Sequence, residues 1–147
     1  MKVAIGSDHR GFEAKQQIKA IATELGHECI DFGTNDSNPV DYPDMAYLTA
    51  NAVSKKQADR GILICATGIG MCMAANKMPG IRAAQAWTPD IARLSRQHNN
   101  ANVLCLAGNF LERSTAQEIV KTFLNSTFDG GRHERRVGKM MELEGRR

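Results

Sequence analysis

Cys65 and the segment after it contain the residue types with the clearest chemical potential. An apolar run ends at Cys65, and the loop Ala66-Thr67-Gly68-Ile69-Gly70 follows it directly. A two-glycine loop that opens a helix presents free backbone N–H groups, which bind anions. A thiol beside them is able to act as a nucleophile or a base. Cys65 taken alone also fits a small buried hydrophobic side chain, which is how most free cysteines behave.

The loop matches neither of two common nucleotide-binding motifs. It lacks the Lys-Ser/Thr pair of a P-loop and the third glycine of the dinucleotide fingerprint. The sequence therefore indicates a general anion-binding loop and does not indicate ATP or NAD.

Three further polar segments are candidates for a site. Ser7-Asp8-His9-Arg10 follows the first apolar run, where Asp8 or Ser7 also fits the cap of a helix. His98-Asn99 ends a helical stretch, where a histidine often serves only to interact with the helix dipole. Arg132 and Arg136 are spaced i, i+4, so on a helix they would share one face and could clamp a phosphate. A solvated basic face is the alternative for this pair.

Histidine and cysteine spacing predicts neither a metal site nor disulfides. The four histidines show no HxxxH spacing, and the four cysteines contain no CxxC pair. Cys29, Cys72 and Cys105 fit packing positions inside apolar stretches. Reduced thiols are therefore expected.

Length and composition indicate one globular domain. The chain has 147 residues, of which 42% are hydrophobic and 24% charged, and these values exclude collagen-like and disordered classes. No apolar run approaches the roughly 18 residues of a membrane span, and the first residues do not resemble a signal peptide. A cytoplasmic protein without membrane partners is expected.

The net charge of +3 comes from the C-terminal segment 130–147. This segment has six Arg or Lys and three Glu, whereas the first 129 residues balance. Because no Lys/Arg block or interleaved aromatic residues accompany the segment, a small phosphorylated ligand is favoured over nucleic acid.

Strand-like and helix-like segments alternate along the chain. Five apolar runs predict strands at 3–6, 28–32, 61–66, 82–87 and 103–107. An apolar stripe from Ala14 to Leu25 predicts a helix that Gly26 ends, Thr88-Pro89 predicts a helix start, and Ser114 with Gln117 has the spacing of a capping box. This order predicts an α/β fold with a doubly wound parallel sheet. Ligands of such sheets bind at the carboxyl ends of the strands, and the irregular segment 33–43 is a candidate functional loop.

Taken together, the motifs of this chain resemble one family, the type B ribose-5-phosphate isomerases, which includes galactose- and allose-6-phosphate isomerases. The resemblance covers nearly the whole chain in the correct order. It rests on Gly6-Ser7-Asp8-His9, Asp31-Phe32-Gly33-Thr34, Asp41-Tyr42-Pro43, Cys65 to Gly70, Ala74-Ala75-Asn76-Lys77, Gly80-Ile81-Arg82-Ala83, Leu94 to Asn99, Asn102-Val103-Leu104 and Gly130-Gly131-Arg132-His133.

The resemblance implies a fold, a reaction and a set of site residues. The fold would be a single-domain Rossmann-like αβα sandwich with five parallel strands, spanning 1–147. The reaction would interconvert ribose 5-phosphate and ribulose 5-phosphate through an enediolate, without metal or organic cofactor. Cys65 would be the base and His98, with Asp8, the ring-opening group. The remaining implied contacts are the backbone of Ala66, Gly68, Ile69 and Gly70 as an anion hole, Thr67 as proton relay, Tyr42 and Asn99 on hydroxyl groups, and His9, Arg132 and Arg136 on the phosphate.

The resemblance also implies a homodimer, or a dimer of dimers, whose sites are shared. The histidine-bearing segment would come from the neighbouring subunit, and the segment 130–147 would contribute to the site. Met71 occupies the place of a glutamate that some relatives use as the base, which favours Cys65 in that role. Ala66 replaces a common glycine and Asn109 a common arginine. A hexose 6-phosphate isomerase is therefore the alternative within the family, and a phosphate-binding signalling or nucleotide module is the alternative outside it.

Overall fold

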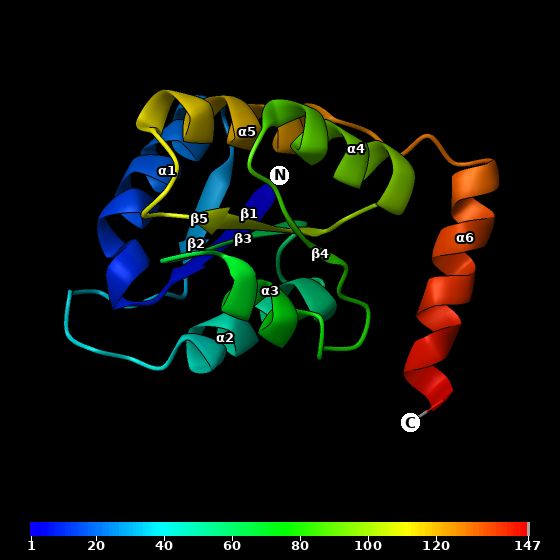
Figure 1. The fold of residues 1–147 in the computed structure, drawn as a ribbon, viewed down its shortest axis with the longest axis horizontal. Helices are drawn as coiled ribbons and strands as arrows, with labels where there is room; N and C mark the ends of the chain where they lie inside the picture. Colours follow the sequence, from blue (N-terminus) through cyan, green and yellow to red (C-terminus); the bar gives the residue numbers. More distant parts are fainter. Residues whose placement is uncertain (147) are drawn as a thin grey trace.

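A computed structural model describes residues 1–146 as one α/β unit built on a five-stranded parallel sheet. The strand order is β2-β1-β3-β5-β4, and all four strand pairings are parallel. The chain therefore reverses its direction of winding at β1, which lies between β2 and β3 (Figure 1). The strands are β1 (Lys2–Ser7), β2 (Glu28–Asp31), β3 (Arg60–Cys65), β4 (Ala83–Gln85) and β5 (Val103–Ala107).

Helices cover both faces of the sheet, which confirms the predicted sandwich. One layer contains α1 (Phe12–Glu24), α4 (Pro89–Asn99) and α5 (Arg113–Asn125); the other contains α2 (Tyr42–Ser54) and α3 (Ile69–Ala75) (Figure 1). A short 3-10 turn, η1 (His9–Gly11), precedes α1. Helix α6 (Arg132–Met141) contacts α4 and stands at one end of the molecule, followed by η2 (Glu142–Arg146). Within the described residues, no helix has the length and apolar character needed to cross a bilayer.

Two hydrophobic cores lie on opposite faces of the sheet because side chains alternate along each strand. Val3 and Ile5 of β1 pack with α1, α4 and α5, whereas Ala4 between them packs on the α2 and α3 side. In β3, Ile64 belongs to the first core and Cys65 to the second. The thiol of Cys65 is therefore on the α2 and α3 side of the sheet.

Most local predictions are confirmed, and two need correction. Asp8 caps η1, Thr88 caps α4, and Gly26 follows α1 at a positive φ of 83°. The capping box at Ser114 is wrong, because α5 begins earlier, at Arg113, and its N-cap residue Glu112 makes no side-chain cap hydrogen bond. The predicted strand 82–87 is shorter, Ala83–Gln85, because it is an edge strand that pairs with β5 alone.

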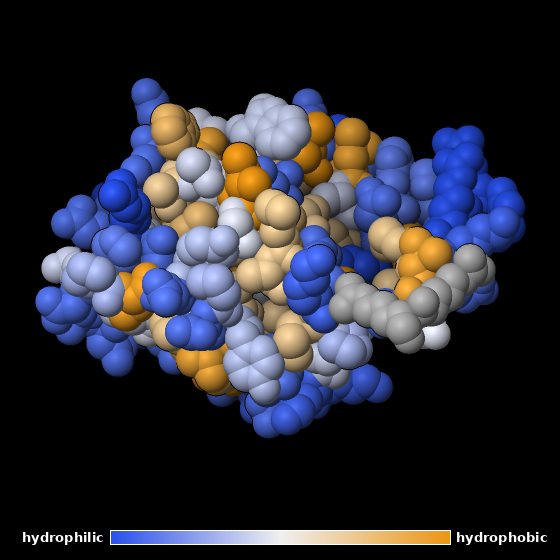
Figure 2. All heavy atoms as spheres, turned by 60° about the horizontal axis from the view of Figure 1, so that its bottom comes forward, coloured by the Kyte–Doolittle hydropathy of each residue, from blue (hydrophilic) through white to orange (hydrophobic). Residues whose placement is uncertain are grey.

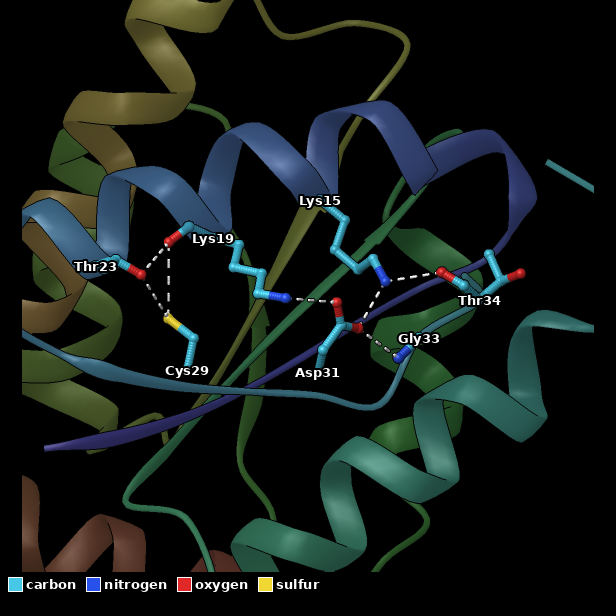
Figure 3. Close-up of polar contacts among 7 residues, drawn as sticks. All are labelled: Lys15, Lys19, Thr23, Cys29, Asp31, Gly33 and Thr34. Carbon is cyan, nitrogen blue, oxygen red and sulfur yellow. Dashed lines mark hydrogen bonds and ion pairs between the residues drawn. The ribbon is translucent and has the colours of Figure 1, made fainter. Parts of the chain in front are cut away.

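A buried ion pair ties α1 to the loop that follows β2 (Figure 3). The fully buried Lys15 ammonium donates to Asp31 Oδ1 at 2.6 Å and to the Thr34 carbonyl at 2.8 Å. Lys19 Nζ reaches the second oxygen of Asp31 at 3.3 Å. Although burial raises the pKa of Asp31, the hydrogen bonds and charge of the two lysines outweigh it and hold that pKa below its usual value. The network fixes the start of the loop 32–41.

Candidate functional site

Cys65 lies at the carboxyl end of β3, beside the reversal point of the sheet. The backbone N–H of Gly68 donates to Cys65 Sγ at 3.1 Å. Gly68 has φ of +76°, and a Cβ at this position would lie 3.0 Å from the Leu106 carbonyl group. Glycine is therefore needed for the turn that aims this amide at the sulfur. A sulfur that accepts from a backbone amide is well suited to carry negative charge.

The rest of the loop after Cys65 is fixed by polar contacts. Thr67 is exposed, and its Oγ1 accepts from the Ile69 N–H at 3.3 Å. The Gln85 side-chain amide donates to the Thr67 carbonyl oxygen. The backbone from Ala66 to Gly70 thus forms a short turn in front of the thiol, and two of its N–H groups, those of Gly68 and Ile69, donate within this segment.

Asp8 and His9 lie at the end of the neighbouring strand β1. Asp8 is buried, and its Oδ1 accepts from the backbone N–H groups of Arg10 at 3.0 Å and Gly11 at 2.9 Å. The capping interpretation of Asp8 is therefore correct, and capping occupies Oδ1. His9 Nδ1 accepts from the Val40 N–H at 3.3 Å. In the neutral ring, this contact leaves the proton on Nε2, which then is a donor.

Tyr42 closes one side of the same region. It is the first residue of α2, and its ring lies so close to Gly70 that a Cβ there would come within 2.8 Å of two ring carbons. The carboxyl edge of the sheet thus brings together one group of predicted site residues, which we call the thiol group: Asp8, His9, Tyr42, Cys65, Ala66, Thr67, Gly68, Ile69 and Gly70.

The remaining predicted residues form a second group, the histidine group: His98, Asn99, Arg132 and Arg136. His98 and Asn99 end α4, and both arginines are exposed on α6. The α6 helix confirms the i, i+4 placement of Arg132 and Arg136. His133 stacks on His98, with ring centroids 4.2 Å apart and an interplanar angle of 4°. The sequence reasoning missed His133, although its place between the two arginines was a possible signal.

The two groups lie at opposite edges of the sheet. Cys65 is paired with Ala107 at the end of β5, whereas α4 ends just before Val103, where β5 begins. At this amino edge, just before β4, the Asn102 N–H donates to the Arg82 carbonyl and the Arg82 N–H donates to the side-chain Oδ1 of Asn102. Four strand steps separate Val103 from Ala107, about 13 Å at ~3.3 Å per residue. A single copy therefore does not bring Cys65 and His98 to one substrate.

Two thiols near the site, those of Cys72 and Cys105, differ in their pKa values. A hydrogen bond from Cys105 lowers the pKa of Cys72 to about 7, despite the opposing effect of burial. The same hydrogen bond, with complete burial, raises the pKa of Cys105. Both side chains belong to the core on the Cys65 side of the sheet. Cys72 is half-buried and packs against this core, in agreement with its predicted packing role.

Known proteins are similar to this chain over nearly its whole length. The family model described as Ribose/Galactose Isomerase matches residues 3–140. Ribose-5-phosphate isomerase B of Escherichia coli is 45% identical over 99% of this chain and 98% of its own. The structure of Clostridium thermocellum ribose-5-phosphate isomerase B has a TM-score of 0.98 and 48% identity, and the match covers 99% of both chains.

A third similar protein was solved with a sugar phosphate. The structure of Mycoplasma genitalium ribose-5-phosphate isomerase B with bound ribulose 5-phosphate has a TM-score of 0.94 and 44% identity to this chain. The match covers 99% of this chain and 97% of the Mycoplasma chain. The matched length thus spans the positions of both groups.

Proposed function

This chain belongs to the ribose/galactose isomerase family and is a sugar-phosphate isomerase, and from that premise we propose that it interconverts ribose 5-phosphate and ribulose 5-phosphate with Cys65 as the base. The observation that carries the proposed mechanism is the 3.1 Å hydrogen bond from the Gly68 amide to Cys65 Sγ. It places a sulfur suited to negative charge beside a row of backbone N–H groups at the carboxyl edge of the sheet.

The chemistry divides between a proton-transfer step and a stabilising environment. The Cys65 thiolate takes the proton from the carbon next to the carbonyl and returns it to the neighbouring carbon. The Gly68 and Ile69 N–H groups already donate to Cys65 Sγ and Thr67 Oγ1. The remaining backbone N–H groups of the loop Ala66 to Gly70 stabilise the negative oxygen of the enediolate. Thr67, exposed at the loop surface, transfers a proton between the two substrate oxygens.

The other groups hold the substrate and open its ring. His98 opens the cyclic sugar together with Asp8, whose Oδ1 is fixed by two backbone amides. Tyr42 and Asn99 contact hydroxyl groups. His9, with Nδ1 occupied by the Val40 amide, donates from Nε2 to the phosphate, and Arg132 and Arg136 supply positive charge.

We further propose that the active site forms between two copies of the chain. The support is the separation of the thiol group from the histidine group on opposite edges of the sheet. The face of α2 and α3 also exposes apolar side chains between polar ones (Figure 2); Leu48 is 41%, Ile69 52% and Met73 64% exposed. Exposed apolar side chains clustered next to a site are typical of an interface. The C-terminal segment 130–147 would then contribute to the partner's site.

The proposed role of Cys65 also favours a cellular compartment in which thiols stay reduced. A catalytic thiol must stay reduced, and the reducing systems of the cytoplasm keep thiols in that state. We propose that the enzyme works there.

The decisive experiment is an isomerase assay in buffer that contains a chelator. Purified protein is given ribose 5-phosphate, with allose 6-phosphate and galactose 6-phosphate in parallel reactions. Rapid formation of ribulose 5-phosphate supports the proposal and shows that Ala66 and Asn109 are compatible with a pentose. Turnover of a hexose phosphate alone would contradict the pentose assignment.

A further inference from the structure

His98, Asp129 and His133 place three metal-ligating side chains at one point on the surface between α4 and α6. One ligand atom from each residue lies within 4.8 Å of the other two. The two histidines are half-buried and Asp129 is exposed. Two imidazoles and one carboxylate are a common ligand set for zinc and related transition metals, and three protein ligands leave one position open.

Backbone and side-chain contacts hold the three residues in place. The Asp129 N–H donates to the Gln97 carbonyl at 3.1 Å, which joins residue 129 to the end of α4. The His133 N–H donates to the Gly130 carbonyl at 3.1 Å. The buried guanidinium of Arg96 donates to the Ser126 carbonyl at 3.3 Å and to the Ala101 carbonyl at 2.6 Å. The fold therefore brings the three residues together, whereas the stacked rings of His98 and His133 have to turn before a nitrogen of each faces the same ion.

Charged groups surround the cluster. Burial, His98, Arg132 and Arg136 lower the pKa of His133, and the Asp129 carboxylate opposes this shift. Arg132 and Arg136 oppose a cation electrostatically, but both side chains are exposed and their charges are screened by solvent.

We propose that His98, Asp129 and His133 form a binding site for a divalent transition metal of the zinc class, whose occupation inhibits the enzyme. The tetrahedral separation of ligand atoms is about 3.3 Å for bond lengths near 2 Å, so side-chain rotations must bring the three ligand atoms closer together. Once bound, the metal occupies a nitrogen of His98 and removes this side chain from ring opening. The inhibition, but not the binding, rests on the proposed role of His98.

Metal binding is tested directly with Co²⁺, whose absorption reports its ligands. Wild-type protein is expected to bind one Co²⁺ per chain, with visible d–d bands and no near-ultraviolet charge-transfer band from a thiolate. Asp129→Asn and His133→Gln should each weaken binding about tenfold or more, since changes outside the ligand shell alone cost about 10–100-fold. Glu134→Gln, next to His133 on α6, is the control and should bind as wild type does.

Inhibition is tested with Zn²⁺ in the isomerase assay. Zn²⁺ should inhibit wild-type protein reversibly, with recovery on addition of a chelator. Asp129→Asn should match wild-type activity in chelator but resist Zn²⁺. A thiolate charge-transfer band that remains in Cys65→Ala, absence of Co²⁺ binding, or binding that neither substitution weakens would overturn the site. Co²⁺ binding at the cluster without Zn²⁺ inhibition would retain the site and overturn its inhibitory role. Absence of isomerase activity in chelator would count against the proposed function and leave the Co²⁺ result standing.

Discussion

At the scale of single residues, Cys65 and Asp8 illustrate how a structural contact and a chemical role coincide. The backbone N–H of Gly68 donates to the sulfur of Cys65, and two backbone N–H groups donate to Asp8 Oδ1. In both cases, backbone N–H groups at the start of a helix or turn donate to a side chain, and that side chain is one that can carry negative charge. A cap and a site residue are therefore not exclusive alternatives.

Replacing the base tests the role of Cys65 directly. Cys65→Ala should lower kcat by about 10²–10⁴-fold, the usual contribution of a positioned base, while sugar-phosphate binding and the free energy of unfolding change little. Turnover and isothermal titration with ribose 5-phosphate measure the two effects. Cys29→Ala, in β2 and away from the loop, is the matched control and should retain activity. Full activity of Cys65→Ala would assign proton transfer to another group.

Replacing a phosphate anchor should instead affect binding. Arg132→Ala should raise KM for ribose 5-phosphate about tenfold or more, because a charge-assisted hydrogen bond contributes about 1.5–3 kcal/mol, and kcat should change less. Arg135→Ala is the control, since Arg135 is exposed on α6 but lies outside the i, i+4 pair. Equal KM values for the two variants would indicate that Arg132 belongs to a solvated basic face and does not anchor the phosphate.

At the scale of secondary-structure elements, the sheet edge and the loop after β2 position the thiol group. β1 and β3 are adjacent and parallel, so their carboxyl ends place Asp8 and Cys65 at the reversal point where such sheets bind ligands. The loop 32–41 contacts His9 through the Val40 amide. This loop begins at the buried Lys15–Asp31 ion pair (Figure 3), so α1 influences the site without contacting a substrate.

Breaking this ion pair should destabilise the protein in a pH-dependent way. Lys15→Met should cost about 3 kcal/mol at pH 7, the usual penalty for removing one partner of a buried pair, measured by urea unfolding. The folded-state pKa of Asp31 is lowered, so the ionised carboxylate contributes stability above its unfolded value of about 3.9. That contribution is lost as the pH falls through the folded-state pKa, and the difference between variant and wild type should shrink below about pH 4. A difference independent of pH would assign the effect to packing alone.

At the scale of the whole molecule, the fold separates the two halves of the proposed site. Helix α4 runs back from the carboxyl edge to the amino edge of the sheet, so its last residues His98 and Asn99 lie far from the loop after Cys65. Helix α6 lies beside the end of α4 at one end of the molecule (Figure 1), and its last residues and η2 contact Arg82 and Gly80. Its exposed residues Arg132 and Arg136 are well placed to reach a neighbouring copy.

Mixing two inactive variants tests a shared site. Cys65→Ala and His98→Asn should each be inactive alone. After subunit exchange in equal amounts, about one quarter of wild-type activity should return, because half of the dimers then contain one intact site out of two. Activity is measured before and after exchange, with each variant exchanged against itself as the control. No recovery despite demonstrated exchange would place both residues in the same subunit's site.

The sequence alone determined the local features of this protein. Continuous apolar runs predicted the five strands, because a strand covered on both faces has no polar side to display. Short-range signals predicted a cap at Asp8, a helix end at Gly26 and a helix start at Thr88-Pro89. These effects depend on neighbours within a few residues, so the sequence records them. The Ser114 capping box failed because the same short spacing also fits inside a helix that begins one residue earlier.

Only the tertiary structure decided which distant residues meet. Lys15 lies on an amphipathic helix, and only packing against Asp31 and the Thr34 carbonyl shows that its ammonium is completely buried. His98 and His133 have no ligand spacing, yet they stack because α6 packs against the end of α4. The opposite placement of Cys65 and His98 follows from the direction of α4 relative to the sheet. Such proximities depend on how whole elements pack, whereas residue spacing records only neighbours along the chain.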